Sequence, residues 1–198
     1  MPTLSICIPT RNRATHLANC ISSLTCAQAN SVNIFQICIS GNNSSDDTAS
    51  IVQQAPTRLN LKYNKHCANV GTARNLLEVV PMADGKSVWV IGDDDLPMPY
   101  AVSTLNRLRD QHPLVDIFYV DSYGLNTDYL ARYPHPFDAT NFLENMQLLS
   151  GWRAEGELPF LDLINPDISF DFLGAYFYQY FENETGINIP TFLTIQLY

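Results

Sequence analysis

The sequence predicts an α/β protein whose mainly parallel β-sheet is flanked by helices on both faces. Up to about residue 120, short apolar runs alternate with segments of helical periodicity, and this alternation implies right-handed crossovers between parallel strands. Polar segments follow the first, second and fourth apolar runs, at Pro9–Arg13, Gly41–Asp47 and Gly92–Asp95. Ligands of such sheets bind at the carboxyl ends of the strands, so we expect these three segments to meet there.

The predicted strands are compact runs rich in Ile, Val and Leu, each bounded by polar or turn-forming residues. Pro9 is expected to stop the first run, because proline cannot donate to a strand ladder. The five predicted strands are Leu4–Ile8, Val32–Ser40, Leu59–Tyr63, Ser87–Ile91 and Val115–Val120.

Four helices are predicted between these strands. Two show an apolar stripe at i, i+3, i+4 and i+7, expected to face the core: Leu17, Cys20, Ile21 and Leu24 in the first helix, and Ala73, Leu76, Leu77 and Val80 in the third. Ser45 or Asp46 is expected to cap the second helix, which runs through Gln54. Pro97 suits the first position of the fourth, which runs to about Asp110.

The alternation ends after Ser122, so we divide the chain into a region 1–122 and a region 123–198. The second region has one credible helix, Ala139–Leu149, and an aromatic run at 168–181 that suits either a strand or a helix. We expect this run to be core, with a dimer face or a peripheral membrane contact as the alternatives. No closing element is evident at Thr194–Tyr198.

Composition excludes several classes of protein. The chain has 198 residues, of which 46% are hydrophobic, which is too many for a disordered polypeptide. The formal net charge of −9 argues against nucleic-acid binding. Residues 1–110 carry nine basic and eight acidic side chains, whereas residues 111–198 carry two and twelve, so the two halves are expected to do different jobs.

The expected location follows from two kinds of segment that the sequence lacks. The N-terminal residues do not resemble a signal peptide, and no run approaches the roughly 20 apolar residues that span a membrane. Five cysteines at irregular spacing predict reduced, buried thiols in a cytoplasmic protein. A peripheral position at the inner membrane stays open, and the sequence does not indicate an oligomeric state.

The sharpest chemical signal is the run Asp93-Asp94-Asp95 at the end of a predicted strand. Adjacent carboxylates repel one another unless a cation or solvent neutralises them. Hard oxygen ligands suit Mg²⁺ or Mn²⁺, and these ions usually keep positions open for substrate phosphates. The alternative is a solvated loop in which Asp95 caps the next helix.

Two groups of arginines could contact such phosphates. Arg11 and Arg13 directly follow the first strand, and a guanidinium can stack on a base or bind phosphate through two hydrogen bonds. Arg74 stands at a loop-to-helix junction within Asn69–Asn75. The alternative for each is a solvated surface arginine.

Four segments together resemble family 2 glycosyltransferases of the GT-A fold, in order and spacing. They are LSICIPTRNR at 4–13, SGNNSSDDT at 40–48, NVGTARN at 69–75 and GDDD at 92–95. The chain most resembles bacterial surface-polysaccharide enzymes of the abequosyltransferase-like kind. The resemblance is specific over residues 3–122 and thinner over 123–181, where SFDFLG at 169–174 looks like a segment of that subgroup.

The resemblance implies a Rossmann-like GT-A fold with a nucleotide-sugar site in residues 1–122. Pro9 and Arg11 would border the base, Arg74 would contact the nucleotide, and Asp93 would lie near the ribose. Asp94 would bind the divalent cation, Mg²⁺ or Mn²⁺, and Asp95 would support that site. The implied nucleotide-sugar set is Pro9, Thr10, Arg11, Arg13, Gly41, Asn42, Arg74 and Asp93, and the metal set is Asp94 and Asp95.

One position departs from the family pattern. Relatives commonly have aspartate where this chain has Gly41, and that aspartate accepts a hydrogen bond from the N3–H of uracil. Glycine cannot accept it, and cytosine has no N3–H to donate. The departure suggests a CDP-sugar donor.

The implied activity is inverting, metal-dependent transfer of a sugar from a nucleotide-diphosphate donor to a saccharide or lipid-linked acceptor. A carboxylate base after the acidic loop would activate the acceptor hydroxyl; the candidates are Asp167, Asp171, Glu182 and Glu184. Region 123–198 would be the acceptor side, and we expect it to be truncated at its C-terminus. The alternative is a non-catalytic nucleotide-sugar-binding module. Sugar nucleotidyltransferases and aspartyl phosphatases are disfavoured, because the first loop has neither glycines nor paired carboxylates.

Overall fold

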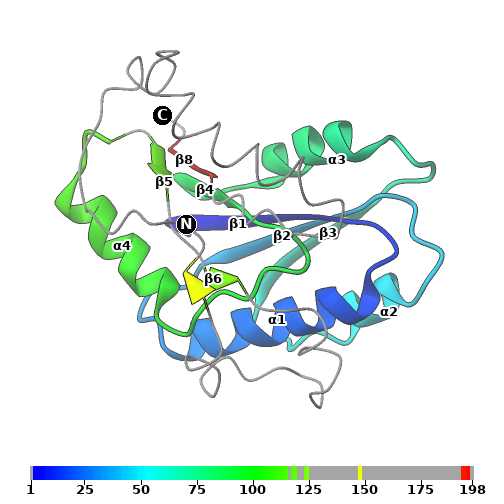
Figure 1. Ribbon diagram of the computed structural model, residues 1–198, viewed down its shortest axis with the longest axis horizontal. Coiled ribbons are helices and arrows are strands. Elements are labelled where there is room, and N and C mark those ends of the chain that lie inside the picture. The colour runs from blue at the N-terminus through cyan, green and yellow to red at the C-terminus, as the bar shows by residue number, and fades with distance from the viewer. Residues whose placement is uncertain (1, 116, 120–122, 125–146, 149–192, 197–198) are drawn as a thin grey trace. The chain divides into compact units, whose positions relative to one another are not determined.

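A computed structural model of the chain describes residues 2–115, 117–119, 123–124, 147–148 and 193–196 (Figure 1). All of these residues belong to one compact unit, Met1–Leu149 with Pro190–Tyr198. A second unit, Ser150–Ile189, lies outside the described residues. The division at residue 122 that we drew from the sequence stays a prediction.

The main sheet has six strands in the order β3-β2-β1-β4-β8-β5. The first four of these pair in parallel, and β8 is antiparallel to both of its neighbours. The strands are β1 Leu4–Thr10, β2 Gln36–Gly41, β3 Asn60–Lys65, β4 Ser87–Val90, β5 Ile117–Tyr119 and β8 Leu193–Gln196. A separate small sheet pairs β6 (Tyr123–Gly124) with β7 (Gln147–Leu148). The mainly parallel sheet is confirmed.

Helices cover both faces of the sheet, as expected (Figure 1). Helix α3 (Thr72–Val79), continued by the 3₁₀ turn η1 (Val80–Met82), lies on one face. Helices α1 (Ala14–Ala29), α2 (Thr48–Gln53) and α4 (Ala101–Gln111) lie on the other. This is the layered arrangement that strand–helix alternation predicts.

The core follows the two-residue period of the strands. Ile6 and Ile8 of β1 belong to the larger cluster, with Leu17 and Leu24 of α1. Cys7, between those isoleucines, belongs to a smaller cluster on the opposite face. Successive side chains of a strand point to opposite faces, so β1 is buried from both sides.

Strand β1 continues through Pro9, which we expected to stop it. The Cys7 carbonyl accepts a hydrogen bond from Ile91 N on the β4 side, and the Thr10 carbonyl accepts one from Asn42 N on the β2 side. Because successive residues of a strand face opposite neighbours, Pro9 faces the β4 side, beyond the last pair of that ladder. Its missing N–H therefore costs the sheet no hydrogen bond.

Strand β2 begins at Gln36, so the expectation of a strand from Val32 was wrong. Val32 is fully exposed and Ile34 is 64% exposed. The first register pair between β1 and β2 joins Ser5 to Gln36, and the first pair between β2 and β3 joins Gln36 to Asn60, so pairing on both sides of β2 begins at Gln36.

Helix α4 begins at Ala101, not at Pro97. A second proline, Pro99, disfavours helical backbone at Met98, the residue before it. The chain closes a turn between Ala101 N and Met98 O, and the helical ladder starts with Thr104 N to Tyr100 O.

Helix α3 exists where expected, but the predicted buried stripe was wrong. Leu76 is 40% exposed and Leu77 is 72% exposed, whereas Asn75 and Val79 are buried. The Asn75 side chain donates to the Ser40 carbonyl and accepts from the Ser40 hydroxyl, and Val79 packs beside Cys7. Hydrogen bonding of Asn75 to the buried strand decides which face of α3 turns inward.

Two expectations for the later part of the chain were also wrong. Leu193–Gln196 forms β8, which enters the sheet between β4 and β5, so the chain does have a closing strand (Figure 1). Gln147–Leu148 is strand β7, where we expected the end of a helix. The rest of that predicted helix, residues 139–146, and the aromatic run 168–181 lie outside the described residues.

The cysteines are free thiols, as predicted, but not all are buried. Cys7, Cys20 and Cys38 are buried, whereas Cys26 and Cys67 are exposed. Of the helices in the described segments, none combines the length and the apolar character that a membrane span requires.

Candidate functional site

The three polar segments do meet at the carboxyl edge of the sheet. Asn12 N donates to Ser44 Oγ over 3.0 Å, and Ser45 N donates to Asn12 Oδ1 over 2.8 Å, which ties the loop after β1 to the loop after β2. Thr10 Oγ1 donates to Asp93 Oδ2 over 2.7 Å, which ties β1 to the loop after β4. The predicted convergence is confirmed.

Asn12 shapes the first of these loops. Its φ of 53° lies in the left-handed region, which asparagine tolerates better than most residues. Its amide oxygen holds Ser45, so the turn is fixed at both the backbone and the side chain. Arg11 and Arg13 lie on either side of this fixed residue.

Asp46 joins the starts of two helices. Its Oδ2 accepts from Ala14 N, the first residue of α1, over 2.9 Å, and its Oδ1 accepts from Thr48 N, the first residue of α2, over 3.1 Å. Carboxylates are favoured at helix N-termini because unpaired backbone N–H groups point at them. Of the two capping candidates from the sequence, Asp46 is the one that contacts the α2 backbone.

The acidic loop after β4 is held by contacts to the loop after β1. Arg13 Nε lies 3.0 Å from Asp93 Oδ1, and Arg13 Nη2 lies 2.5 Å from Asp94 Oδ2. Asp95 Oδ2 turns back to accept from Gly92 N over 2.6 Å. The three aspartates therefore have different partners: Asp93 has Thr10 and Arg13, Asp94 has Arg13, and Asp95 has the loop backbone.

Burial makes ionisation of this loop costly. Burial raises the pKa of Asp93 to about 6, against the opposing effects of its hydrogen bond from Thr10 and the charge of Arg13. Burial, opposed by the Gly92 N–H bond and helped by the charges of the other two aspartates, raises the pKa of Asp95 to about 7. A cation at this loop would favour the ionised carboxylates.

Gly92 leaves room for Asp94. A Cβ at position 92 would lie 2.6 Å from Asp94 Oδ1, so any larger residue there would push the carboxylate away. Asp94 Oδ2 is the oxygen that meets Arg13, so in this structure the cation beside Asp94 is a guanidinium.

The donor set fits a divalent cation that is shared with a substrate. Within the part of the chain that the structure describes, no group of three or more His, Cys, Asp or Glu is placed to hold a metal by itself. Mg²⁺ and Mn²⁺ commonly use one or two carboxylates and fill their remaining positions with phosphates and water. Asp94 can supply such a carboxylate, and Asp95 can support the loop through Gly92. Both assignments stay predictions.

Gly41 ends β2 at this edge, and Tyr63 of β3 fills the space beside it. A Cβ at Gly41 would lie 2.6 Å from the Tyr63 hydroxyl, so an aspartate fits there only if Tyr63 moves. The Tyr63 hydroxyl is buried and has no hydrogen-bond partner, and burial raises the pKa of this tyrosine. The absence of aspartate at position 41 is thus matched by the packing around it.

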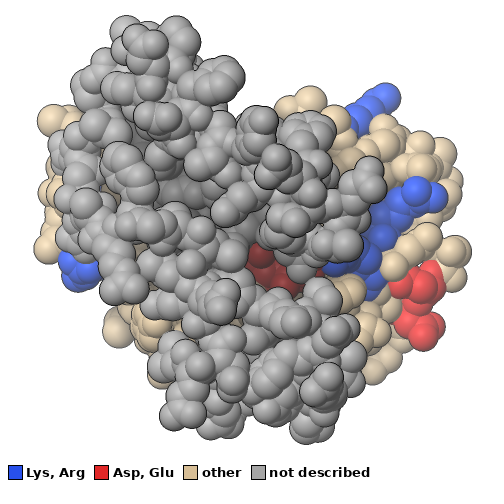
Figure 2. Space-filling model, in the orientation of Figure 1, with Lys and Arg blue, Asp and Glu red and all other residues tan. Residues whose placement is uncertain are grey.

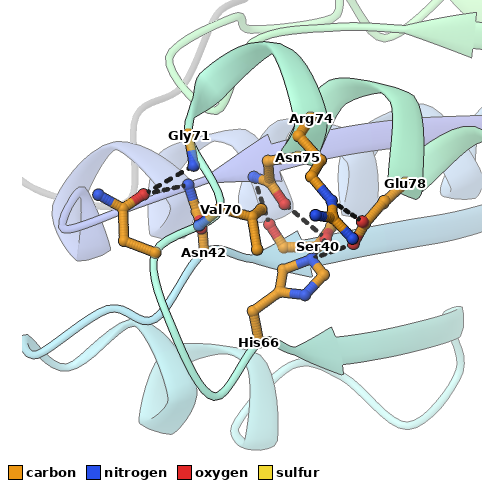
Figure 3. Close-up of polar contacts among 9 residues, drawn as sticks. Ser40, Asn42, His66, Val70, Gly71, Arg74, Asn75 and Glu78 are labelled. Carbon is orange, nitrogen blue, oxygen red and sulfur yellow. Dashed lines mark hydrogen bonds and ion pairs between the residues drawn. The ribbon is translucent and has the colours of Figure 1, made fainter.

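Asn42 holds the loop that leads into α3 (Figure 3). Its Oδ1 accepts from Val70 N over 2.8 Å, and its Nδ2 donates to Asn69 Oδ1 over 2.9 Å. Asn69 Oδ1 also accepts from Gly71 N, where a φ of 86° turns the chain into the helix. Asn42 is buried, so the geometry assigns it a role in holding this loop; its predicted contact with a nucleotide stays a prediction.

Arg74 reaches out from the first turn of α3 and is 70% exposed at its side chain. Its Nε donates to Glu78 Oε1 over 2.5 Å, and Glu78 Oε2 lies 3.3 Å from His66 Nε2 (Figure 3). The exposed pairing leaves Arg74 able to turn toward a ligand at little cost.

The polar chain behind Arg74 was not predicted from the sequence. Ser40 Oγ donates to Asn75 Oδ1 and lies 3.0 Å from His66 Nε2 (Figure 3). These residues lie far apart in the sequence and carry no common motif. Ser, His and Glu here are not a nucleophilic triad, because Ser40 and Glu78 both meet the same ring nitrogen and Ser40 is fully buried.

The candidate bases Asp167, Asp171, Glu182 and Glu184 lie outside the described residues. Arg11 is exposed in the loop after β1, and Pro9 lies within β1. On the face that Figure 2 shows, blue Lys and Arg side chains of the described residues lie beside red Asp and Glu side chains.

Most of the chain matches a known protein family. Residues 5–156 match the family described as Glycosyl transferase family 2. The chain is similar to abequosyltransferase RfbV of Salmonella typhimurium, with 30% identity over 135 residues, which cover 67% of this chain and 40% of that protein. It is also similar to the GalNAc(5)-diNAcBac-PP-undecaprenol beta-1,3-glucosyltransferase of Campylobacter jejuni, with 34% identity over 114 residues, which cover 56% of this chain and 36% of that protein. The chain thus spans about two fifths of the length of these relatives.

Solved structures share the fold. S. aureus TarS in complex with UDP superimposes with a TM-score of 0.58 and 23% identity, covering 64% of this chain and 37% of that one. The mannosyltransferase PcManGT of Pyrobaculum calidifontis, in complex with GDP-Man and Mn²⁺, gives a TM-score of 0.51 and 20% identity, covering 59% and 34%. At these identities the similarity supports the GT-A fold.

Proposed function

The chain belongs to glycosyltransferase family 2, and from this premise we propose that it binds a nucleotide-diphosphate sugar at the carboxyl edge of its sheet and transfers the sugar to a saccharide or lipid-linked acceptor. The observation that carries the proposal is the junction of Thr10 and Arg13 with Asp93 and Asp94. It brings two carboxylates and one guanidinium group to the edge where α/β sheets bind nucleotides.

The proposed roles follow from the chemistry of each group. Arg13 and Arg74 would bind phosphate oxygens, Arg11 would border the base, and Asp93 would accept a hydrogen bond from the ribose. Asp94 would hold Mg²⁺ or Mn²⁺ with the support of Asp95. The ion supplies positive charge that stabilises the diphosphate as a leaving group.

Inversion at the sugar carbon is part of the proposal. A single displacement requires a carboxylate within hydrogen-bond reach of the acceptor hydroxyl, to take its proton as the new bond forms. Asp167, Asp171, Glu182 and Glu184 remain the candidates. By similarity to the two relatives, we propose a place in bacterial surface-polysaccharide synthesis, on the cytoplasmic side of the inner membrane.

Replacement of Asp94 tests the proposal. Asp94→Asn removes the charge of the proposed metal ligand, so we expect Mn²⁺-dependent transfer from a labelled nucleotide sugar to a membrane lipid extract to fall about 100-fold or more. Asp110→Asn, the same change at an exposed position of α4, is the control and should leave transfer unchanged. Equal transfer by the two variants would exclude Asp94 as the ligand.

A non-catalytic nucleotide-sugar-binding module is the second candidate. It would need only the groups at the carboxyl edge, where Thr10 and Arg13 meet Asp93 and Asp94. Calorimetry separates the two: a module binds nucleotide with Mn²⁺ and loses this binding in Asp94→Asn, yet neither transfers nor hydrolyses the donor.

We further propose a CDP-sugar as the donor. The support is the lack of an acceptor side chain at Gly41, together with Tyr63 packed where that side chain would project. Calorimetric titration of CDP, UDP, dTDP and GDP in the presence of Mn²⁺ should find CDP bound most tightly. Tightest binding of UDP would overturn this choice of base while leaving the transferase proposal intact.

A further inference from the structure

The guanidinium of Arg13 links two successive carboxylates of the acidic loop. Nε lies 3.0 Å from Asp93 and Nη2 lies 2.5 Å from Asp94, so one side chain compensates both charges. The side chain of Asp94 is 16% exposed and that of Arg13 is 40% exposed. Both partners of this ion pair are therefore partly exposed.

The carboxylate of Asp94 cannot serve Arg13 and a metal ion at full strength. Its Oδ2 already meets Arg13 Nη2 over 2.5 Å. Two positive groups on one carboxylate repel each other, and this repulsion is strong at a partly buried site. Metal binding to Asp94 therefore competes with Arg13.

We propose that Arg13 is a built-in counter-cation of the acidic loop, which occupies Asp94 in the free protein and must release it before a divalent cation binds there. The inference rests on the proposed function, because it takes Asp94 as the metal ligand. Arg13 is a positioning residue in this scheme: it keeps the carboxylates in place without metal.

The exchange couples metal binding to nucleotide binding. When the nucleotide diphosphate binds, it offers Arg13 a new anionic partner. The guanidinium can then leave Asp94 without losing a counter-charge. The metal ion should therefore bind weakly to the free protein and more tightly with nucleotide. The coupling is reciprocal, as linkage requires.

Mn²⁺ titration followed by electron paramagnetic resonance measures this without any turnover. In the absence of nucleotide, we expect Arg13→Gln to bind Mn²⁺ about tenfold more tightly than the wild-type chain. Saturating CDP or UDP should tighten Mn²⁺ binding in the wild-type chain more than in Arg13→Gln. Equal or weaker nucleotide-free binding by Arg13→Gln overturns the inference.

Arg11→Gln is the matched control. It removes the same charge from the same loop, and Arg11 makes no ion pair among those found in the described segments. The affinity of Arg11→Gln for Mn²⁺ without nucleotide should therefore stay within about threefold of wild type. A tenfold gain in this variant as well would show a general charge effect and overturn the role of Arg13.

The outcomes separate this inference from the proposed function. Nucleotide-dependent Mn²⁺ binding that Arg13→Gln leaves unchanged overturns the inference alone. Absence of Mn²⁺ binding in every folded variant, with either nucleotide, overturns the proposed metal-dependent site and the inference with it. If circular dichroism finds Arg13→Gln unfolded, Arg13→Lys carries the test, since one ammonium retains the charge but cannot bridge both carboxylates; its affinity should exceed wild type.

Discussion

At the scale of single residues, the site depends on polar side chains that hold loops as much as on those that would touch a ligand. Asp46 contacts the first backbone N–H of both α1 and α2, and Asn12 fixes the loop between Arg11 and Arg13. These contacts fix the backbone from which the side chains of Arg11 and Arg13 extend. The residues that would bind phosphate are thus placed by neighbours that carry no obvious chemical signal.

Asp46 allows a prediction on stability and pH. Asp46→Ala removes acceptors at two helix starts, so we expect the free energy of unfolding to fall by about 1–2 kcal/mol at pH 7. The pKa of Asp46 is below its usual 3.8: desolvation raises it, but the hydrogen bonds from Thr48 and Ala14 outweigh that effect. Because the folded-state pKa is lower than the unfolded-state pKa, ionised Asp46 stabilises the fold at pH values above the unfolded-state pKa. This stabilisation is lost as the pH falls through the folded-state pKa.

The difference between wild type and Asp46→Ala should therefore shrink when urea unfolding is measured at pH 3 instead of pH 7. Asp47→Ala is the control: Asp47 is exposed, and its side chain makes no capping bond to α2. A difference that is the same at both pH values would show that the charge of Asp46 is not what stabilises these helix starts.

At the scale of elements, α3 shows how a polar contact can override an apolar pattern. Leu76 and Leu77 belong to the expected stripe, yet they are exposed because Asn75 bonds to Ser40 inside the sheet. The orientation puts Arg74 and Glu78 together on the outer surface. A stripe that faced inward through the leucines would have turned Arg74 elsewhere.

This orientation predicts unequal effects of two substitutions in α3. Val79→Ala should lower the free energy of unfolding by about 2 kcal/mol, because Val79 is fully buried against Cys7 and Val88. Leu77→Ala should change it by less than about 0.5 kcal/mol, because that side chain is 72% exposed. Urea denaturation measures both, and a larger loss for Leu77→Ala would contradict the assigned face.

Sequence patterns predicted elements well where local signals decide them. The apolar runs of β1 and β4 and the stripe of α1 were enough, because burial on one or both faces enforces their period. They also predicted the meeting of the three loops, since parallel strands bring their carboxyl ends to one edge. The predicted start of α4 was wrong because Pro99, not Pro97, decides where helical backbone can begin.

At the scale of the whole molecule, the sheet is completed by a distant segment. Strand β8 lies between β4 and β5 and pairs antiparallel with both, so it connects the first part of the sheet to its last strand. Only four residues form it, and their partners are far away in the sequence, so no local pattern could reveal it. The polar chain through Ser40, His66 and Asn75 escaped prediction for the same reason.

A proline in β8 tests its importance. Thr194 pairs with Trp89 on one side and Phe118 on the other, so Thr194→Pro removes a donor from a central strand. We expect a loss of about 3 kcal/mol or more in the free energy of unfolding. Thr194→Ala, which keeps the backbone N–H, should retain most of the stability. Equal stability of the two variants in urea would argue against β8 as a central strand.

The position of β8 also has a consequence for biosynthesis. During synthesis, β4 has no partner on its outer side until Leu193–Gln196 has left the ribosome. Until then the parallel strands have an unpaired edge. Pairing across such a separation is slow, because the loop must close before the contact stabilises anything. The sheet that would hold the nucleotide therefore matures late, and nascent chains should depend on protection from aggregation until β8 arrives.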